Sequence, residues 1–263
     1  PIIQLSQYHM KKLLVSGVFI LLIAVATQST KAQPKPRFRA LAIAEIGGGH
    51  VLFTEAAKIW LNKLAADSNF AIDYITDTKT ITKSLLANYQ LFIQLNYPPY
   101  PWGEEAQAAF TDYIEQGRGG WVGFHHPTLL GVFDGYPMWQ WYSAFMGGIM
   151  FKDYLPGGTS ARLIVEDKNH PVMKGLQPVF ITKDEWYLYN KSPRSNVHVL
   201  ASIDESTYDP PKEKKMGDHP VIWTNEHVKA RNIYIAMGHF PELFKDENYT
   251  RLVKNAIFWA VKK

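Results

Sequence analysis

The chain has 263 residues, of which 46% are hydrophobic, 14% aromatic and 20% charged, a composition typical of a globular protein with one large domain or at most two. It contains no cysteine, so disulfide bonds and thiol catalysis are excluded. The formal charge is only +4, and no basic stripe of the kind that binds nucleic acid runs along the chain.

Residues 10–32 have the organisation of a secretory signal peptide. A basic start is followed by an apolar run over residues 13–26 and a small-residue end at Ala32. The run is too short for a transmembrane span and no second one follows. We therefore expect cleavage after Ala32 and a periplasmic or secreted protein without a stable membrane anchor; an uncleaved anchor is the alternative. Residues 1–9 would lie upstream of the true start. Cleavage would remove three lysines and no acidic residue with this segment, which lowers the formal charge from +4 to +1.

Residues 37–263 are predicted to form a single domain. In its first half, apolar runs that predict strands alternate with segments that predict helices. Strands are expected over residues 39–46, 71–75, 91–95 and 120–124, and helices over residues 53–66, 81–87 and 104–116. This alternation implies βαβ units and a parallel sheet with right-handed crossovers. Such sheets bind ligands beyond the carboxyl ends of their strands.

The second half of the chain is less regular. Strands are expected over residues 161–166, 186–189, 197–201, 221–224 and 232–237, and helices over residues 139–145 and 248–261. Apolar residues recur at helical spacing in the closing helix, which indicates that this helix packs against the sheet.

The sharpest local feature covers residues 119–127, where an apolar strand ends in Gly-Phe-His and passes directly into a turn. This pattern resembles a nucleophile elbow, in which a tight turn after a strand projects one side chain into the pocket. His125 occupies the projecting position and His126 follows it. We expect His125 to face a ligand as an acid, a base or a metal ligand. A core histidine that only bonds the backbone is the alternative.

A second histidine, His239, comes just after a predicted strand, and Glu242 lies three residues further on. A histidine oriented by a nearby carboxylate is a candidate general base. The alternative is a loop histidine followed by a helix-capping glutamate.

The first predicted strand is followed by three glycines and His50. Consecutive glycines allow the backbone to approach a ligand closely, so Gly48, Gly49 and His50 are predicted to line the substrate pocket. Neither a dinucleotide fingerprint nor a Walker loop is present. A simple sharp turn is nearly as good an interpretation.

The pair Asp184 and Glu185 offers a carboxylate partner for a histidine, and the spacing does not choose between them; we favour Glu185. A divalent-metal site built from His50, His125, His239 and a carboxylate stays a hypothesis, because spacing along the chain does not reveal convergence in space.

Trp102 lies in an aromatic-rich loop and is predicted to pack against a sugar; an aromatic core is at least as good an interpretation.

Taken in order, these motifs resemble the ThuA-like (trehalose-utilisation) family. The segments that carry the resemblance are residues 119–126, 170–172, 175–176, 184–185, 220–223, 238–239 and 256–260. The resemblance implies an α/β fold, a flavodoxin-like three-layer sandwich with a mainly parallel sheet, similar to class I glutamine amidotransferases. Those enzymes use an elbow cysteine and a His-x-Glu pair. This chain has His125 at the elbow and one extra residue between His239 and Glu242, so a thiolate acyl intermediate is excluded.

The resemblance also implies a role in carbohydrate metabolism. Our first hypothesis is an enzyme acting on a disaccharide or a 3-keto-sugar, since a ketone acidifies the neighbouring C–H bond. His125 and His239 would be the acid–base pair and Glu185 would orient one of them, while a divalent metal would serve as an alternative means of polarising the ketone. The expected partners are a small carbohydrate and a sugar oxidoreductase in the same pathway. A non-catalytic sugar-binding protein is the alternative.

Overall fold

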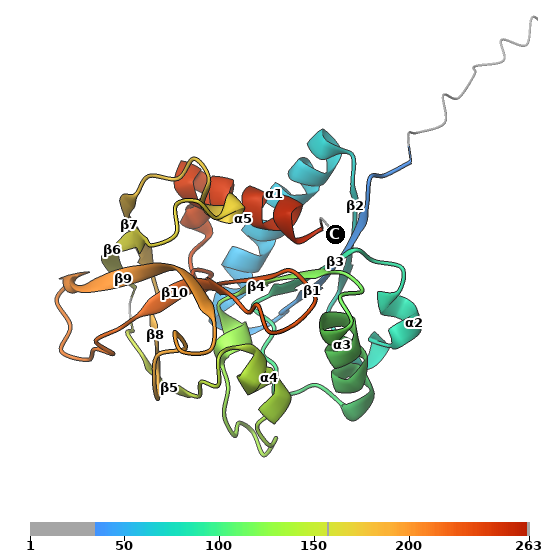
Figure 1. Cartoon of the computed structure of the whole chain (residues 1–263), viewed down its shortest axis with the longest axis horizontal. Helices are drawn as coiled ribbons and strands as arrows, with labels where there is room; N and C mark the ends of the chain where they lie inside the picture. Colours follow the sequence, from blue (N-terminus) through green and yellow to red (C-terminus); the bar gives the residue numbers. More distant parts are fainter. Residues whose placement is uncertain (1–34, 157, 262–263) are drawn as a thin grey trace, which may run out of the picture. The chain divides into compact units, whose positions relative to one another are not determined.

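The computed structural model describes residues 35–156 and 158–261, and its centre is a nine-stranded sheet (Figure 1). The strand order is β2-β1-β3-β4-β11-β10-β9-β6-β7. In that order the strands are β2 (Ala71–Ile75), β1 (Arg39–Ala44), β3 (Leu91–Leu95), β4 (Gly120–Phe124), β11 (Asn232–Ile235), β10 (Pro220–Thr224), β9 (His198–Asp209), β6 (Thr159–Val165) and β7 (Val179–Asp184). A separate two-stranded sheet pairs β5 (Phe151–Tyr154) with β8 (Tyr187–Tyr189).

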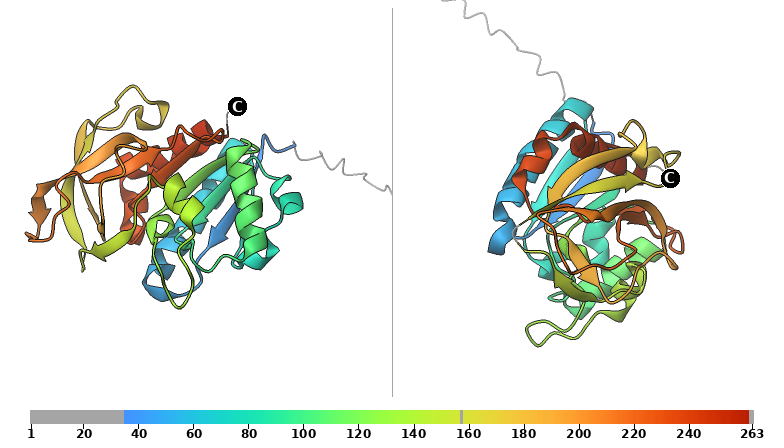
Figure 2. Two further views of the ribbon diagram at one scale, coloured as in Figure 1. Left: turned by 60° about the horizontal axis from the view of Figure 1, so that its bottom comes forward. Right: turned by 90° about the vertical axis from the view of Figure 1, so that its left-hand side faces the viewer.

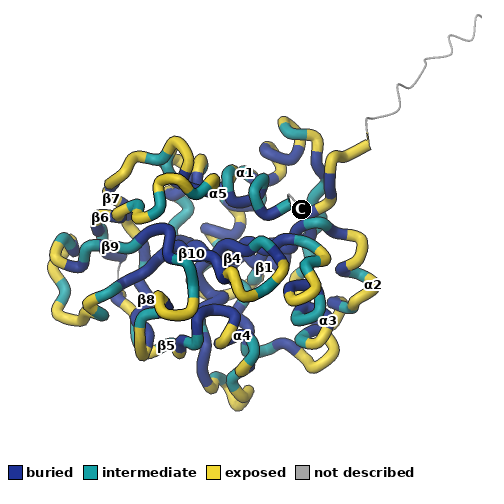
Figure 3. The backbone as a smooth tube through the Cα atoms, in the orientation of Figure 1, coloured by how far each residue is buried: buried dark blue, intermediate teal, exposed yellow. Residues whose placement is uncertain are grey.

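The sheet has a parallel half and an antiparallel half. Strands β2, β1, β3, β4 and β11 are parallel, whereas β10, β9, β6 and β7 pair antiparallel. Every residue of β3 and β4 is buried, as expected for parallel strands covered on both faces. Strand β7 instead alternates exposed and buried residues, so one of its faces is open to solvent. Figure 3 shows the buried centre of the sheet.

Helices cover the parallel half on both faces (Figures 1 and 2). The helices α1 (Val51–Ser68) and α5 (Glu247–Ala260) lie together on one face. The helices α2 (Lys83–Leu86), α3 (Glu104–Glu115) and α4 (Gln140–Phe145) lie on the other. Within the described residues, five short 3-10 helices connect these elements: η1 (Gly48–His50), η2 (Thr78–Thr80), η3 (His126–Thr128), η4 (Pro171–Met173) and η5 (Pro241–Lys245). The result is the expected three-layer α/β sandwich.

Most predicted elements are present, with differences at their ends and in the antiparallel half. Strands β2, β3 and β4 have the predicted bounds. Strand β9 continues to Asp209, well beyond the predicted residue 201, and β5 and β7 were not predicted. Each missed strand contains an adjacent Lys-Asp pair, Lys152 and Asp153 in β5 and Lys183 and Asp184 in β7, so neither has the continuous apolar run that identifies the central strands.

The predicted signal peptide, residues 10–32, lies outside the residues that the structure describes. Among the described helices, none combines the length and the apolar character that crossing a membrane requires. From Lys35 onward the chain forms one compact unit.

Candidate metal and substrate site

The turn after β4 holds His125 in an unusual backbone conformation. Its φ is 59° and its ψ is −84°, a region that costs a non-glycine residue about 1–3 kcal/mol unless its surroundings enforce it. The surroundings do so here. The His125 N–H donates to the Ile235 carbonyl at 2.9 Å, and the Tyr234 hydroxyl donates to the His125 carbonyl at 2.9 Å. The elbow-like turn therefore projects the His125 side chain beyond the end of the strand.

The segment after β11 packs directly against this turn. A Cβ added to Gly238 would lie 2.7 Å from His125 Cβ and 3.1 Å from Asn96 Oδ1, distances too short for ordinary packing. Asn96 also donates to the Gly238 carbonyl at 2.6 Å. Only a glycine lets the two loops meet this closely, and the contact carries His239 toward His125.

Four side chains from distant parts of the chain converge at the carboxyl edge of the parallel strands. They are His50, His125, Glu185 and His239. His125 Nε2 lies 3.3 Å from Glu185 Oε2, and His239 Nδ1 lies 2.9 Å from His50 Nε2. Glu185 Oε2 is also 3.9 Å from His50 Nε2 and 3.6 Å from His239 Nδ1. The four atoms all lie within 4.8 Å of one another. We call this group the four-ligand cluster.

The strands explain this convergence. His50 ends η1, which follows β1; His125 follows β4; and His239 follows β11. These three strands are parallel members of one sheet, so their carboxyl ends share one edge. Glu185 reaches the same edge from the link between β7 and β8.

The cluster is partly shielded from water, and this burial sets its protonation. Burial lowers the pKa of His125 to about 3 and also lowers the pKa of His50. The hydrogen bond with Glu185 raises the pKa of His239. Burial opposes ionisation of Glu185, but its contacts with His125, His239 and His50 outweigh that effect and hold the Glu185 pKa below its usual range. At neutral pH, His125 and His50 therefore offer lone pairs beside a carboxylate.

The second ring nitrogen of His125 fixes its tautomer. Nδ1 lies 2.9 Å from the Ala236 carbonyl oxygen, which can only accept, so Nδ1 carries the proton and Nε2 presents its lone pair to the cluster. This arrangement, in which the outer N–H is bonded to a carbonyl, is typical of histidines that bind metal ions.

Asp184 and Glu185 have different roles, which the spacing alone could not distinguish. Asp184 is fully buried, and it accepts backbone N–H bonds from Glu185 at 2.8 Å, Gly238 at 3.0 Å and His239 at 3.3 Å. Burial raises its pKa to about 7 against the opposing effect of these donors. Asp184 thus holds in place the two chain segments that carry Glu185 and His239.

Three other predicted site residues lie at or near the cluster. The ring centroid of His126 is 4.1 Å from that of His50, and its Nδ1 donates to the Asn96 carbonyl at 2.8 Å. Gly48 and Gly49 are exposed and directly precede His50, and Gly48 has a φ of 75°, which favours glycine.

The structure does not bring Trp102 or Glu242 to the cluster. Trp102 is buried beneath α3, where its indole donates to the Pro98 carbonyl at 3.0 Å and its ring lies 5.2 Å from that of Phe110. It belongs to the aromatic core. Glu242 is exposed in η5, and the carboxylate near His239 is Glu185 instead.

Sequence reasoning missed Glu45, which lies beside the cluster. Its Oε2 is 3.3 Å from His126 Nδ1 and 3.8 Å from His50 Nδ1. The position of Glu45 immediately after β1 could have identified it as a site residue. The strand was predicted to continue through residue 46, however, which placed Glu45 inside it.

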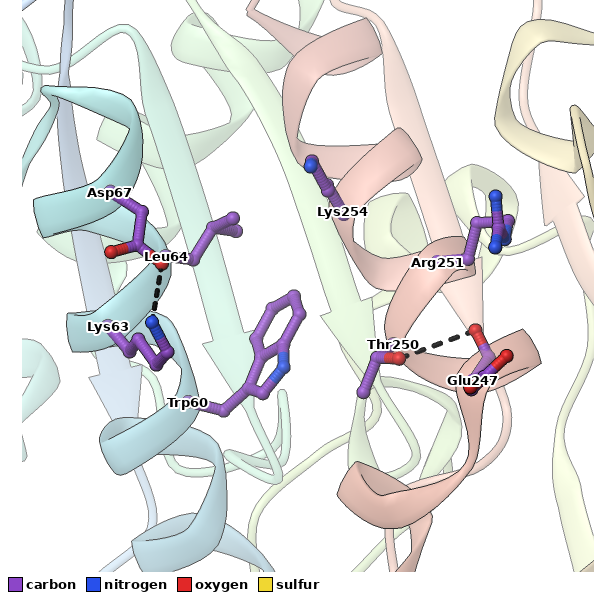
Figure 4. A pocket seen from close by; sticks show the side chains of 8 residues that line it. All are labelled: Trp60, Lys63, Leu64, Asp67, Glu247, Thr250, Arg251 and Lys254. Atoms are coloured by element: carbon purple, nitrogen blue, oxygen red, sulfur yellow. Dashed lines mark hydrogen bonds and ion pairs between the residues drawn. The ribbon is translucent and has the colours of Figure 1, made fainter.

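A cavity between α1 and α5 is separate from the cluster (Figure 4). Its lining residues are Trp60, Lys63, Leu64, Asp67, Glu247, Thr250, Arg251 and Lys254. Lys63 is paired with Asp67 at 2.7 Å. None of these residues belongs to the four-ligand cluster, so the cavity does not contribute to that site.

Residues 39–260 match the family model described as "ThuA: Trehalose utilisation". The chain belongs to the ThuA family. It is 33% identical to a ThuA-like protein from Bacteroides uniformis of known structure, with 87% of this chain and 93% of that one covered and a TM-score of 0.78. A ThuA-like protein from Parabacteroides merdae is 20% identical, with coverage of 87% and 91% and a TM-score of 0.63.

The glutaminase domain of Trypanosoma brucei CTPS, determined with bound acivicin, has the same fold at 7% identity. It aligns with a TM-score of 0.51 over 84% of this chain and 94% of that one. This similarity confirms the predicted glutamine amidotransferase-like architecture. It does not imply that the two proteins catalyse the same reaction. Curated proteins yield no match to this ThuA-family chain.

Proposed function

We propose that this protein is a carbohydrate-processing enzyme that binds a divalent metal ion through His50, His125, Glu185 and His239. The observation that carries the proposal is the convergence of their four nitrogen and oxygen atoms within 4.8 Å of one another. In a tetrahedral zinc site with bonds of about 2.0 Å, the ligand atoms lie about 3.3 Å apart. The separations of 2.9 Å, 3.3 Å and 3.6 Å in the cluster are close to that value. When bound, such an ion supplies a Lewis acid that polarises a carbonyl oxygen of the substrate.

The same geometry changes the roles that we expected for His125 and His239. His125 Nδ1 is bonded to a carbonyl and its Nε2 faces Glu185, so neither nitrogen is directed at a substrate proton. His239 Nδ1 faces His50. These contacts support ligand roles for both histidines in place of an acid–base pair.

The family's description supports a sugar as substrate. We propose a disaccharide carrying a 3-keto group, because a ketone gives the polarising site an oxygen to act on and acidifies the adjacent C–H bond. An oxidoreductase that forms the ketone would be the metabolic partner.

We also propose, from the signal-peptide pattern of residues 10–32, that the protein acts in the periplasm or outside the cell.

The experiment uses purified protein loaded with Zn²⁺ or Mn²⁺, with metal content measured by mass spectrometry and turnover measured on trehalose, other disaccharides and their 3-keto forms. We expect about one ion per chain, consumption of a keto-sugar, and loss of both in His125→Ala. His227→Ala, at an exposed position, is the matched control and should retain both.

Two results would contradict the proposal. Turnover without bound metal would return His125 and His239 to an acid–base role. A sugar that raises the melting temperature but is never consumed would identify a sugar-binding protein.

A further inference from the structure

We propose that Glu45 is the catalytic base of this site, taking a proton from the sugar carbon next to the ketone. The inference rests on the proposed function and deepens it. If the four-ligand cluster holds a metal, its histidine lone pairs are engaged, and proton transfer requires another group within reach of the substrate.

The position of Glu45 suits this role. It follows β1 directly, and its backbone N–H donates to the Leu95 carbonyl of β3 at 3.1 Å, which extends the parallel pairing by one residue. Its carboxylate therefore stands at the sheet edge where the four-ligand cluster lies. The side chain is 22% exposed, so a substrate can reach it.

One oxygen of this carboxylate has no hydrogen-bond partner among the described residues. Oε2 is buried and unsatisfied, although a buried carboxylate oxygen is costly to leave unpaired. Asp184 is a useful contrast, because backbone N–H groups satisfy it. Because Oε2 is buried, the oxygen that can meet a substrate is Oε1, which is not among the buried atoms and makes no hydrogen bond within the described residues.

His126 lies next to the buried oxygen of Glu45. Its Nδ1 faces the Asn96 carbonyl at 2.8 Å, which can only accept, so Nδ1 carries a proton. Glu45 Oε2 lies 3.3 Å from the same nitrogen. The His126 N–H is used by the Asn96 carbonyl, so His126 lies beside Oε2 without satisfying it.

A row of aromatic rings leads from the cluster through the buried Tyr187 to three partly exposed rings that could contact a sugar. The Tyr187 ring is 4.2 Å from that of His125, and the Phe151 ring is 4.9 Å from Tyr187. Phe133 and Tyr100 continue the row, 5.2 Å apart. Sugar C–H groups pack well on such rings.

The proposed step is a β-elimination that balances without an oxidant or reductant. Glu45 takes the proton from C2, and the C–H electron pair forms the enolate of the 3-ketone. As the enolate reforms the carbonyl, the C2 electrons form a C1=C2 double bond and the C1–O glycosidic bond breaks. The departing oxygen takes the electrons of that bond and the proton from Glu45. The products are an unsaturated keto-sugar and a free alcohol, and Glu45 returns to its carboxylate form.

The test compares wild type, Glu45→Gln, Glu45→Asp and the exposed-loop control Glu213→Gln, each as the metal-loaded chain. In D2O, wild type should place deuterium at the carbon beside the ketone of a 3-keto-disaccharide, as measured by NMR. Glu45→Gln should lose this exchange, and its kcat should fall by about 10²–10⁴-fold with little change in KM. Glu45→Asp should retain part of both activities, and Glu213→Gln should retain all of them.

Metal content and the sugar-induced rise in melting temperature are the independent readouts, and Glu45→Gln should leave both unchanged. Full turnover in Glu45→Gln, or joint loss of turnover and metal, would overturn the base assignment alone. An inactive wild type that also binds no metal would overturn the proposed function, and the base assignment with it.

Discussion

His125 is held in a backbone conformation that side chains rarely adopt, and specific neighbours keep it there. The hydroxyls of Thr128 and Tyr234 both donate to its carbonyl, at 3.1 Å and 2.9 Å. Gly238 supplies the space that the turn needs. The strain at one residue is therefore offset by contacts from two other elements, and the position of the cluster depends on them.

Gly238→Ala tests this dependence. The new methyl group would lie 2.7 Å from His125 Cβ, and both backbones must move to relieve the clash. We expect a loss of about 1–3 kcal/mol in the free energy of unfolding, together with weaker metal binding. Urea unfolding and metal titration measure the two effects. Gly49→Ala is the stability control, because its added methyl meets no atom within 4 Å; equal losses in both variants would refute the packing argument.

Local sequence patterns explain which residues of the site could be predicted from the sequence. His50, His125 and His239 were predicted because each follows an apolar run, either directly or after the glycines that end it. Glu45 was not, because its neighbour Ile46 extends that run although it is 72% exposed. Trp102 was misassigned because an aromatic side chain in a loop looks the same in the sequence whether it packs in the core or faces a ligand.

At the scale of elements, the buried parallel strands could be predicted and the antiparallel ones only in part. A strand covered on both faces needs an unbroken apolar sequence, which β3 and β4 have. Strand β7 has charged residues at its last two positions and exposes Ile181 by 70%, so burial does not determine its sequence. Yet β7 ends at Asp184 and delivers Glu185 to the cluster, so the least predictable part of the sheet supplies the carboxylate ligand.

A buried carboxylate joins three of these elements. Glu205 on β9 accepts from His219 Nδ1 at 2.9 Å and from the backbone N–H groups of Met216 and Gly217. His219 Nε2 lies 3.0 Å from the carbonyl of Tyr187 on β8. The bridge therefore connects β9, the segment before β10, and the strand whose Tyr187 packs on His125.

We expect Glu205→Gln to cause a loss of stability that depends on pH. Burial raises the Glu205 pKa, but the hydrogen bonds from His219, Met216 and Gly217 outweigh it and lower the pKa from 4.5 to about 2. A lowered folded-state pKa stabilises the protein above the unfolded pKa and loses that effect as the pH falls toward 2. We expect the substitution to cost about 1–3 kcal/mol at neutral pH.

Urea unfolding between pH 7 and pH 2.5 measures this contribution as the difference between wild type and Glu205→Gln. The difference should be largest at pH 7 and shrink below about pH 4.5. A difference that is independent of pH would show that the bridge does not depend on the charge of Glu205. Glu213→Gln should follow wild type throughout.

At the scale of the whole molecule, the parallel sheet gathers residues that are 189 positions apart, as in the contact between His50 and His239. The predicted fold placed three histidines at strand ends, but their meeting depends on loop conformations and on the shared strand edge, which spacing does not encode. This long-range convergence means that a ligand bound at the cluster links β1, β4, β11 and the β7–β8 connection, and it should therefore stabilise the entire fold.

Removal of metal tests that link. An ion that binds only the folded chain, at about 100 times its Kd, adds about 2.7 kcal/mol to the free energy of unfolding, which corresponds to about 5–10 °C in Tm for a chain of this size. We expect EDTA to lower the Tm of the loaded protein by this amount and Zn²⁺ to restore it. His239→Ala should show neither change, whereas the exposed His227→Ala should show both. A Tm that EDTA does not affect would mean that the four side chains are held together by their own hydrogen bonds and that no ion contributes to the stability of the fold.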